Sequence, residues 1–170
     1  VFFSGEMTWQ LSHRPGHPPH HGSYAMSLGT QVEAVFTGGS LLFGSVGRPD
    51  LIGPDTTEEL AHAQWHSVRT LVTSVDDSAA VLPTHGFGSF CSATATVGVE
   101  STIGHQARTN PAALLDEHEF VAELLEGLDA FPAYYKHMGP ANEQGARAID
   151  LSPADVADPE ELRRRIDAGE

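Results

Sequence analysis

Short β-forming segments alternate along this chain with longer segments of helical periodicity, and this alternation restricts the fold. We predict strands at residues 7–11, 23–26, 34–36 and 79–82, and a long loop at residues 84–105. We predict helices from residue 56 to about residue 72, from near Asp116, after Pro132 and after Asp158. Thr56 with Glu59, and Asp116 with Glu119, have the spacing of N-terminal capping pairs. Asp158, followed by Pro159, is a predicted N-cap of the last helix. Short strands that alternate with helices favour an α/β fold.

Charge and cysteine content restrict the partners and the compartment. The 170 residues carry a net charge of −14 at pH 7, which disfavours nucleic acid and anionic membrane surfaces as partners. The single cysteine, Cys91, excludes an internal disulfide framework and fits a reducing compartment, so we expect a cytoplasmic protein. No apolar run reaches the length of a transmembrane helix. We therefore expect neither a nucleic-acid partner nor a membrane partner.

Two histidines follow predicted strands in a way that suits metal binding. Pro15 and Gly16 force a tight turn after the first predicted strand, and His17 lies just beyond that turn. His85 likewise follows a strand end, where side chains in an open α/β sheet line the ligand crevice. Rigid turns of this kind fix the direction of an imidazole before an ion arrives. The alternatives are a solvated polar loop for His17 and a loop-capping role for His85.

Other polar clusters have weaker signals. His62 and His66 are four residues apart on a predicted helix and share a face, but the sequence offers no third ligand and a solvated face is the preferred interpretation. His20 and His21 are expected at the surface. The segment Arg48-Pro49-Asp50 predicts a local arginine–carboxylate pair that fixes a loop. A Cys–His nucleophile pair between Cys91 and His85 is conceivable, but nothing in the sequence activates the thiol.

Several sequence blocks, in order, resemble a known superfamily. They are "LSHRPGHPPHHGSYAM", "VFTGGSLLFGSVGRPDL", "LPTHGFGSFC", "STIGHQARTNPAALL" and "FVAELLEGLDAFPAYYKHM". Together they resemble the metallo-β-lactamase fold superfamily over residues 7–150, and within it the glyoxalase II and persulfide dioxygenase branch, which is often fused to rhodanese domains. The final segment, "PEELRRRIDAGE", resembles the first helix of such a rhodanese domain.

The resemblance implies an incomplete αββα metallo-β-lactamase-like sandwich. Residues 1–150 would form the C-terminal portion of that domain, and residues 151–170 a linker and the start of a rhodanese-like segment. The resemblance places His17 at a metal-binding histidine of the family and His85 at its second-site histidine. The implied cofactor is iron or zinc. The implied reaction is metal-dependent hydrolysis or sulfur oxidation of a glutathione-type thiol substrate.

Three departures from the family pattern indicate a degenerate metal site. The HxHxDH motif, which supplies most metal ligands in the family, is absent, so we expect the chain to lack its beginning. The metal-binding aspartate of the family's FTGD block is replaced by Gly39. The arginine expected to contact a glutathione carboxylate is replaced by Ala107, and Arg108 is one residue out of register. Arg108 is therefore a weak candidate for substrate binding.

These departures leave three functions open. The first is a metallohydrolase or persulfide dioxygenase whose remaining ligands come from outside this chain. The second is a non-catalytic remnant or partner-binding module of the same fold. In either case a missing half would leave apolar surface uncovered, so we expect self-association or a partner chain that supplies that half. The third is a metal-buffering surface that holds nickel or zinc weakly through His13, His17, His20 and His21.

Overall fold

The computed structural model describes residues 1–96, 98–130, 132–145, 148–149, 151–152 and 158–169. The chain divides into two compact units, Val1–Ala130 and Phe131–Glu170. The expected domain boundary at residue 150 falls on a residue outside the described ones, so that boundary stays a prediction.

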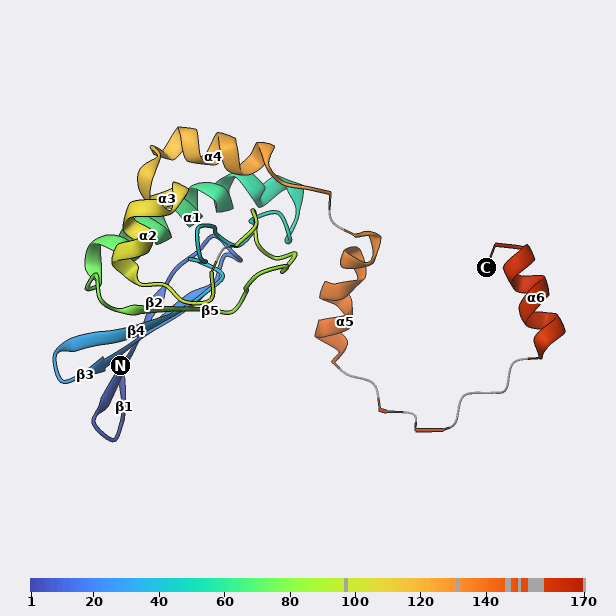
Figure 1. Cartoon of the computed structure of the whole chain (residues 1–170), viewed down its shortest axis with the longest axis horizontal. Coiled ribbons are helices and arrows are strands. Elements are labelled where there is room, and N and C mark those ends of the chain that lie inside the picture. Colours follow the sequence, from blue (N-terminus) through green and yellow to red (C-terminus); the bar gives the residue numbers. More distant parts are fainter. Residues whose placement is uncertain (97, 131, 146–147, 150, 153–157, 170) are drawn as a thin grey trace. The chain divides into compact units, whose positions relative to one another are not determined.

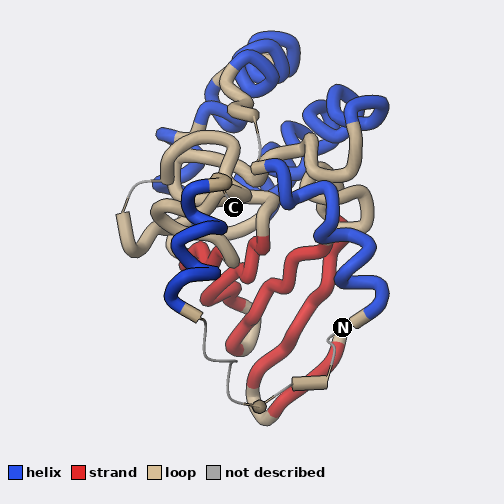
Figure 2. The backbone as a smooth tube through the Cα atoms, turned by 90° about the vertical axis from the view of Figure 1, so that its right-hand side faces the viewer, coloured by secondary structure: helices blue, strands red, loops and turns tan. Residues whose placement is uncertain are grey.

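A five-stranded sheet forms the base of the first unit (Figure 1). Its strands, in both chain order and spatial order, are β1 (Phe2–Ser4), β2 (Met7–His13), β3 (Gly22–Leu28), β4 (Gln31–Gly38) and β5 (Ala80–Pro83). The first four are antiparallel neighbours, whereas β5 runs parallel to β4. A parallel neighbour needs a crossover connection, and the long helix α1 (Pro54–Ser74) supplies it. Figure 2 shows the strands side by side in one twisted sheet.

Helices cover one face of this sheet (Figure 1). Besides α1 they are α2 (Ile103–Thr109), α3 (Pro111–Leu114) and α4 (Glu117–Glu126). Val35 and Val81 point from the sheet into a core that contains Val68 and Leu71 of α1 and Phe120 of α4. Each such side chain contributes about 1.5–3 kcal/mol on burial, so this helix layer holds the sheet in place.

The opposite face of the sheet is apolar and open among the described residues. Leu11, Tyr24, Phe36 and Leu82 are successive cross-strand partners, so they lie on the same face. Their exposed fractions range from 38% to 55%. Trp9 extends this face, with ring centroids 5.9 Å from Phe2 and 5.5 Å from Phe36. An aromatic sheet face of this kind is a surface that another layer would cover.

Most predicted elements are present, with longer bounds. The predicted caps of α4 and α6 (Pro159–Asp167) are confirmed, because Asp116 accepts a hydrogen bond from the Glu119 N–H at 3.0 Å and Asp158 accepts one from the Glu160 N–H at 3.1 Å. The predicted capping pair of α1 is wrong. That helix starts at Pro54, whose fixed φ suits the first helical position, and Gly53 is its N-cap.

The elements that we did not predict from the sequence are short. Strand β1 has three residues and is exposed. Helices α2 and α3 have seven and four residues, too few for a periodic pattern to emerge. Each is fixed by a side-chain cap instead: Thr102 accepts from the His105 N–H, and Asn110 accepts from the Ala112 N–H.

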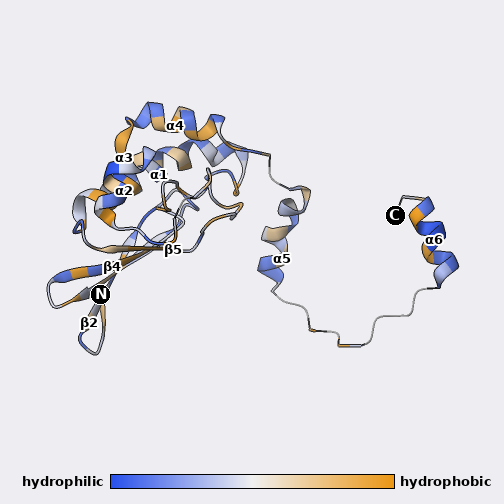
Figure 3. Cartoon of the chain, viewed as in Figure 1, coloured by the Kyte–Doolittle hydropathy of each residue, from blue (hydrophilic) through white to orange (hydrophobic). Residues whose placement is uncertain are grey.

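Among its described residues, the second unit contains three short helical segments: η1 (Ala133–His137), α5 (Met138–Gln144) and α6. Helix α6 carries both hydrophilic and hydrophobic residues (Figure 3), and Leu162 and Ile166 are exposed one turn apart on it. Among the described residues, no helix has the length and apolar character that crossing a membrane requires.

Candidate functional site

Three histidines gather at one end of the sheet. His17 and His21 lie on the connection from β2 to β3, and His85 follows β5. The ring centroids of His17 and His85 are 5.4 Å apart and nearly perpendicular, and those of His17 and His21 are 6.4 Å apart. Because β2 and β4 are both antiparallel to β3, and β5 is parallel to β4, the residues that follow β2 and β5 meet at the same edge of the sheet. The two histidines singled out from the sequence are therefore neighbours, while their metal-binding role stays a prediction.

His17 is held in one tautomer. Its Nδ1 lies 2.7 Å from the Arg48 carbonyl oxygen, and a carbonyl only accepts, so Nδ1 donates the hydrogen and Nε2 keeps its lone pair. Burial lowers the pKa of His17, although the Arg48 carbonyl and the charge of Asp50 oppose this effect. The ring is therefore neutral at pH 7. A backbone carbonyl that fixes a neutral imidazole in this way is common behind metal-binding histidines.

Arg48 anchors the loop that orients His17. Its guanidinium, 2% exposed, forms a bidentate pair with Asp50 in which both N···O distances are 2.7 Å. The same group donates to the Asp129 carbonyl at 2.6 Å and lies 4.6 Å from the centre of the Phe90 ring. The predicted local arginine–carboxylate pair is confirmed. It fixes the backbone whose carbonyl holds His17.

The ring of His17 fills the space beside Gly39. A Cβ at position 39 would lie 2.2 Å from Cδ2 of His17 and 2.9 Å from its Nε2, far inside van der Waals contact. A Cβ on Gly47, on the other side, would lie 2.5 Å from Cγ of the same ring. The backbone N–H of Gly47 donates to the Gly39 carbonyl at 2.8 Å, which draws these two glycines together. The space that a side chain at position 39 would need, where the family resemblance implies an aspartate, is thus occupied by the imidazole.

His21 is a site residue that the sequence did not reveal. Its Nε2 accepts the Gly39 N–H at 3.1 Å, so Nδ1 carries the hydrogen and donates to the Ser40 hydroxyl at 2.9 Å. That hydroxyl donates to the Arg14 carbonyl at 3.0 Å. Burial and the neighbouring His17 lower the pKa of His21. The expectation of a surface position holds for His20 but is wrong for His21, which is half-buried and holds the turn after β4.

His85 lies at the mouth of an open groove. The groove has a volume of about 630 Å³ and is lined by Phe43, residues 80–87 and residues 98–101. Burial, and secondarily the proximity of His17, lowers the pKa of His85, so its ring is also neutral at pH 7. A substrate in this groove would lie against an uncharged imidazole.

Comparisons with known proteins agree with this architecture. No family model matches the chain. The uncharacterized protein ML0493 of Mycobacterium leprae (strain TN) is 29% identical over 107 residues, which cover 63% of this chain and 40% of that protein. A metallo-beta-lactamase from Staphylococcus aureus subsp. aureus COL matches 96% of this chain and 51% of its own, with a TM-score of 0.78 and 23% identity. ETHE1 from Myxococcus xanthus matches 81% of this chain and 54% of its own, with a TM-score of 0.62 and 26% identity.

The chain has the metallo-β-lactamase fold. It spans about half the length of the two solved structures and 40% of the length of the curated relative. Its single sheet with one helix layer is accordingly an incomplete αββα metallo-β-lactamase-like sandwich, as the sequence predicts.

The residues of this metallo-β-lactamase fold chain do not by themselves fit an iron or zinc centre. Within the described ranges, no three histidine, cysteine, aspartate or glutamate side chains are placed to hold an ion. His17 and His85 supply two imidazoles, whereas a catalytic metal generally takes three or more protein ligands. The nearby position 39 has no side chain and no room for one.

Arg108 lies apart from the histidines. It donates to Asp77 at 3.2 Å, and both side chains are exposed. Asp77 precedes β5 while His85 follows it, so the two residues lie at opposite ends of that strand. A substrate-binding role for Arg108 stays a prediction.

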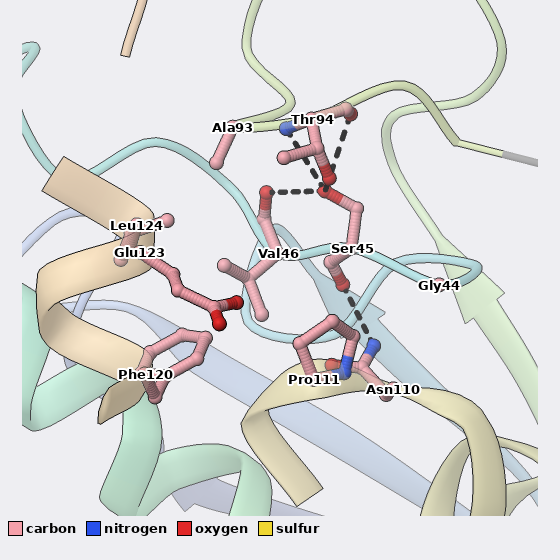
Figure 4. Close-up of a pocket in the computed structure, with 10 residues that line it drawn as sticks. All are labelled: Gly44, Ser45, Val46, Ala93, Thr94, Asn110, Pro111, Phe120, Glu123 and Leu124. Atoms are coloured by element: carbon pink, nitrogen blue, oxygen red, sulfur yellow. Dashed lines mark hydrogen bonds between the residues drawn. The ribbon is translucent and has the colours of Figure 1, made fainter. Parts of the chain in front are cut away.

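A second, smaller cavity lies between the loops and α4 (Figure 4). Its volume is about 80 Å³, and it is lined by Gly44, Ser45, Val46, Ala93, Thr94, Asn110, Pro111, Phe120, Glu123 and Leu124. Pockets for drug-sized ligands are larger, about 300–1,000 Å³. None of the three histidines lines this cavity.

Proposed function

We propose that the protein to which this chain belongs acts on a glutathione-type thiol substrate by metal-dependent hydrolysis or sulfur oxidation. In this proposal the chain contributes His17 and His85 and holds a degenerate part of the centre. The likeness to ETHE1, a member of the persulfide dioxygenase branch, supports the substrate class. The groove beside His85 offers the space for that substrate.

The observation that carries the proposal is the orientation of His17. Its hydrogen bond to the Arg48 carbonyl leaves Nε2 as the acceptor, and the ring of His85 lies 5.4 Å away. These contacts suit two neutral imidazoles that bind a metal together with ligands from elsewhere in the protein. The filled space beside Gly39 is the reason why the missing ligands have to come from outside the described residues.

The experiment compares this chain with a longer form of the protein that includes the HxHxDH motif. Thioester hydrolysis and oxygen consumption with glutathione persulfide are measured for both. We expect background rates for this chain alone and activity for the longer form. In the longer form, His17→Gln and His85→Gln each lower the rate by about 100-fold or more, because each removes a group at the reacting centre.

His20→Gln is the matched control, because His20 is three residues from His17 and is exposed. It leaves the rate unchanged. Equal rates for His17→Gln and the unsubstituted protein would overturn the proposal.

The open sheet face favours a second candidate, a partner-binding module without catalysis. Leu11, Tyr24, Phe36 and Leu82 form an apolar surface that suits a second layer from another chain. If the longer form shows no turnover with either substrate, this candidate replaces the first.

A further inference from the structure

Three metal-ligating side chains meet away from the candidate site, on the outside of the helix layer. His62 Nδ1 lies 2.7 Å from Glu117 Oε1, and His66 Nε2 lies 3.2 Å from the same oxygen. The two histidines are one turn apart on α1, and Glu117 is the first residue of α4. The sequence offered no third ligand for the histidine pair, because Glu117 is 55 residues from His62 and reaches it only through helix packing.

The packing of α1 against the α3–α4 junction positions the carboxylate. Trp65, which lies between the two histidines in the sequence, donates from its indole N–H to the Leu115 carbonyl at 3.1 Å. Asp116 then caps α4, so the chain turns and Glu117 faces α1. His118 adds a further imidazole, with its ring centroid 6.2 Å from that of His62. The cluster therefore rests on two rigid helices.

We propose that His62, His66 and Glu117 bind a divalent transition-metal cation such as Zn²⁺ and thereby link α1 to α4. Two imidazole nitrogens and one carboxylate oxygen are a donor set that suits Zn²⁺. Water or His118 completes the coordination. The excess of acidic residues, which gives the chain a net charge of −14, favours the approach of a cation.

The spacing of the donors shows how much has to change. An ion at about 2.0–2.2 Å from tetrahedral ligands holds its donor atoms about 3.4 Å apart. The separation of His66 from Glu117 is close to that value, whereas the 2.7 Å separation of His62 from Glu117 has to open by about 0.7 Å. Among the described residues no group of three is spaced for an ion as it stands. Here Glu117 Oε1 accepts a hydrogen bond from His62 and lies 3.2 Å from His66 Nε2. The side chain of His66 is 64% exposed, so it is free to rotate.

In the metal-free state His62 donates a hydrogen bond to the Glu117 carboxylate, and His66 Nε2 lies 3.2 Å from the same oxygen. The hydrogen bond from His62, aided by the nearby histidine charges, lowers the pKa of Glu117, so this carboxylate is ionised at neutral pH. For a cation to bind here, a neutral ring has to carry its hydrogen on its other nitrogen, whereas a protonated ring releases one proton.

The test titrates Zn²⁺ into the untagged chain against a chromogenic chelator at pH 7.5, with the imidazole ¹⁵N resonances recorded in parallel. We expect one site whose occupation shifts the resonances of His62 and His66. Glu117→Gln and His66→Gln weaken this site by about tenfold or more, because each removes a ligand. The affinity falls as the pH is lowered, because protons compete with the ion for the imidazole nitrogens.

His105→Gln is the matched control, because His105 is an exposed histidine on α2 outside the cluster. It leaves the affinity unchanged. All the substituted positions are partly or fully exposed, so the variants are expected to fold. Equal Zn²⁺ affinity in Glu117→Gln, His66→Gln and His105→Gln would overturn the proposal, as would Zn²⁺-dependent shifts confined to other histidines.

Discussion

At the residue scale, the ring of His17 fills the space that a side chain at position 39 would need. Position 39 carries no side chain, and Gly47 lies on the other side of the ring. A side chain at position 39 and the present position of His17 therefore exclude each other. An aspartate placed at position 39 would require the ring of His17 to move.

Gly39→Ala tests this directly. A Cβ 2.2 Å from the ring of His17 forces that ring to move, so we expect a destabilisation of about 1–3 kcal/mol, typical of overpacking. Urea unfolding measures the change. Gly86→Ala is the control, because a Cβ there meets nothing within 4 Å. Equal stability of the two variants would contradict the conclusion that the ring of His17 fills the space beside Gly39.

His21 gives a prediction about pH. Its Nε2 accepts the Gly39 N–H only while the ring is neutral, and burial lowers its pKa in the folded chain below the unfolded value of about 6.5. The unfolded chain then binds more protons, so this contribution to stability is complete above about pH 6.5 and is lost as the pH falls below it. We expect the free energy of unfolding to decrease between pH 7.5 and pH 5.5.

The comparison with His21→Gln isolates this effect. Glutamine has no proton to gain in this range, so the variant loses less stability than the unsubstituted chain over the same interval. If the unsubstituted chain and His21→Gln show the same pH dependence, the loss of stability comes from other groups. That result would contradict the stabilising role of the neutral His21 ring.

At the element scale, the sequence predicted the features that depend on local chemistry. The capped starts of α4 and α6 and the long apolar stripe of α1 could be recognised, because their signals lie within a few residues. The closeness of His17 and His85 followed from their places after strand ends. The position of His21 did not, because its partner, the Gly39 N–H, is brought to it by the packing of the β2–β3 connection against the end of β4. For the same reason the sequence did not predict the contact between His62 and Glu117, which the packing of α1 against α4 creates.

Asn110 joins α2, α3 and the loop after β4. Its buried amide donates to the Ser45 carbonyl at 3.0 Å and to Gln106 Oε1 at 3.0 Å, while its Oδ1 caps α3. Asn110→Ala leaves buried acceptors unsatisfied and removes a cap, so we expect a loss of about 2–4 kcal/mol by urea unfolding. Thr109→Ala, at the exposed neighbour, is expected to change stability by about 0.5 kcal/mol or less. Similar losses for both variants would contradict this role.

At the scale of the whole molecule, the chain presents one half of a layered fold. It spans about half the length of the solved structures that share its architecture, and one face of its sheet is apolar and open among the described residues. Such a surface drives association in water. The function of the protein is therefore expected to depend on what covers this face.

Self-association of the isolated chain is the measurable consequence. Leu11 is 55% exposed in the middle of the open face, so Leu11→Glu is expected to shift the chain toward monomer in sedimentation experiments. Val99→Glu is the control, because Val99 is 96% exposed but lies outside the sheet. A monomeric unsubstituted chain, or equal effects of the two variants, would argue against association through this face.

The most direct test of the degenerate metal site is the iron and zinc content of the purified, untagged chain by plasma mass spectrometry. The metal content is measured in the Glu117→Gln variant, so that metal bound at the proposed site on α1 and α4 does not contribute to it. We predict less than about a tenth of an equivalent of either metal, because two imidazoles without a carboxylate at position 39 do not form a tight centre. Near-stoichiometric metal that disappears in a further His17→Gln variant would contradict this account.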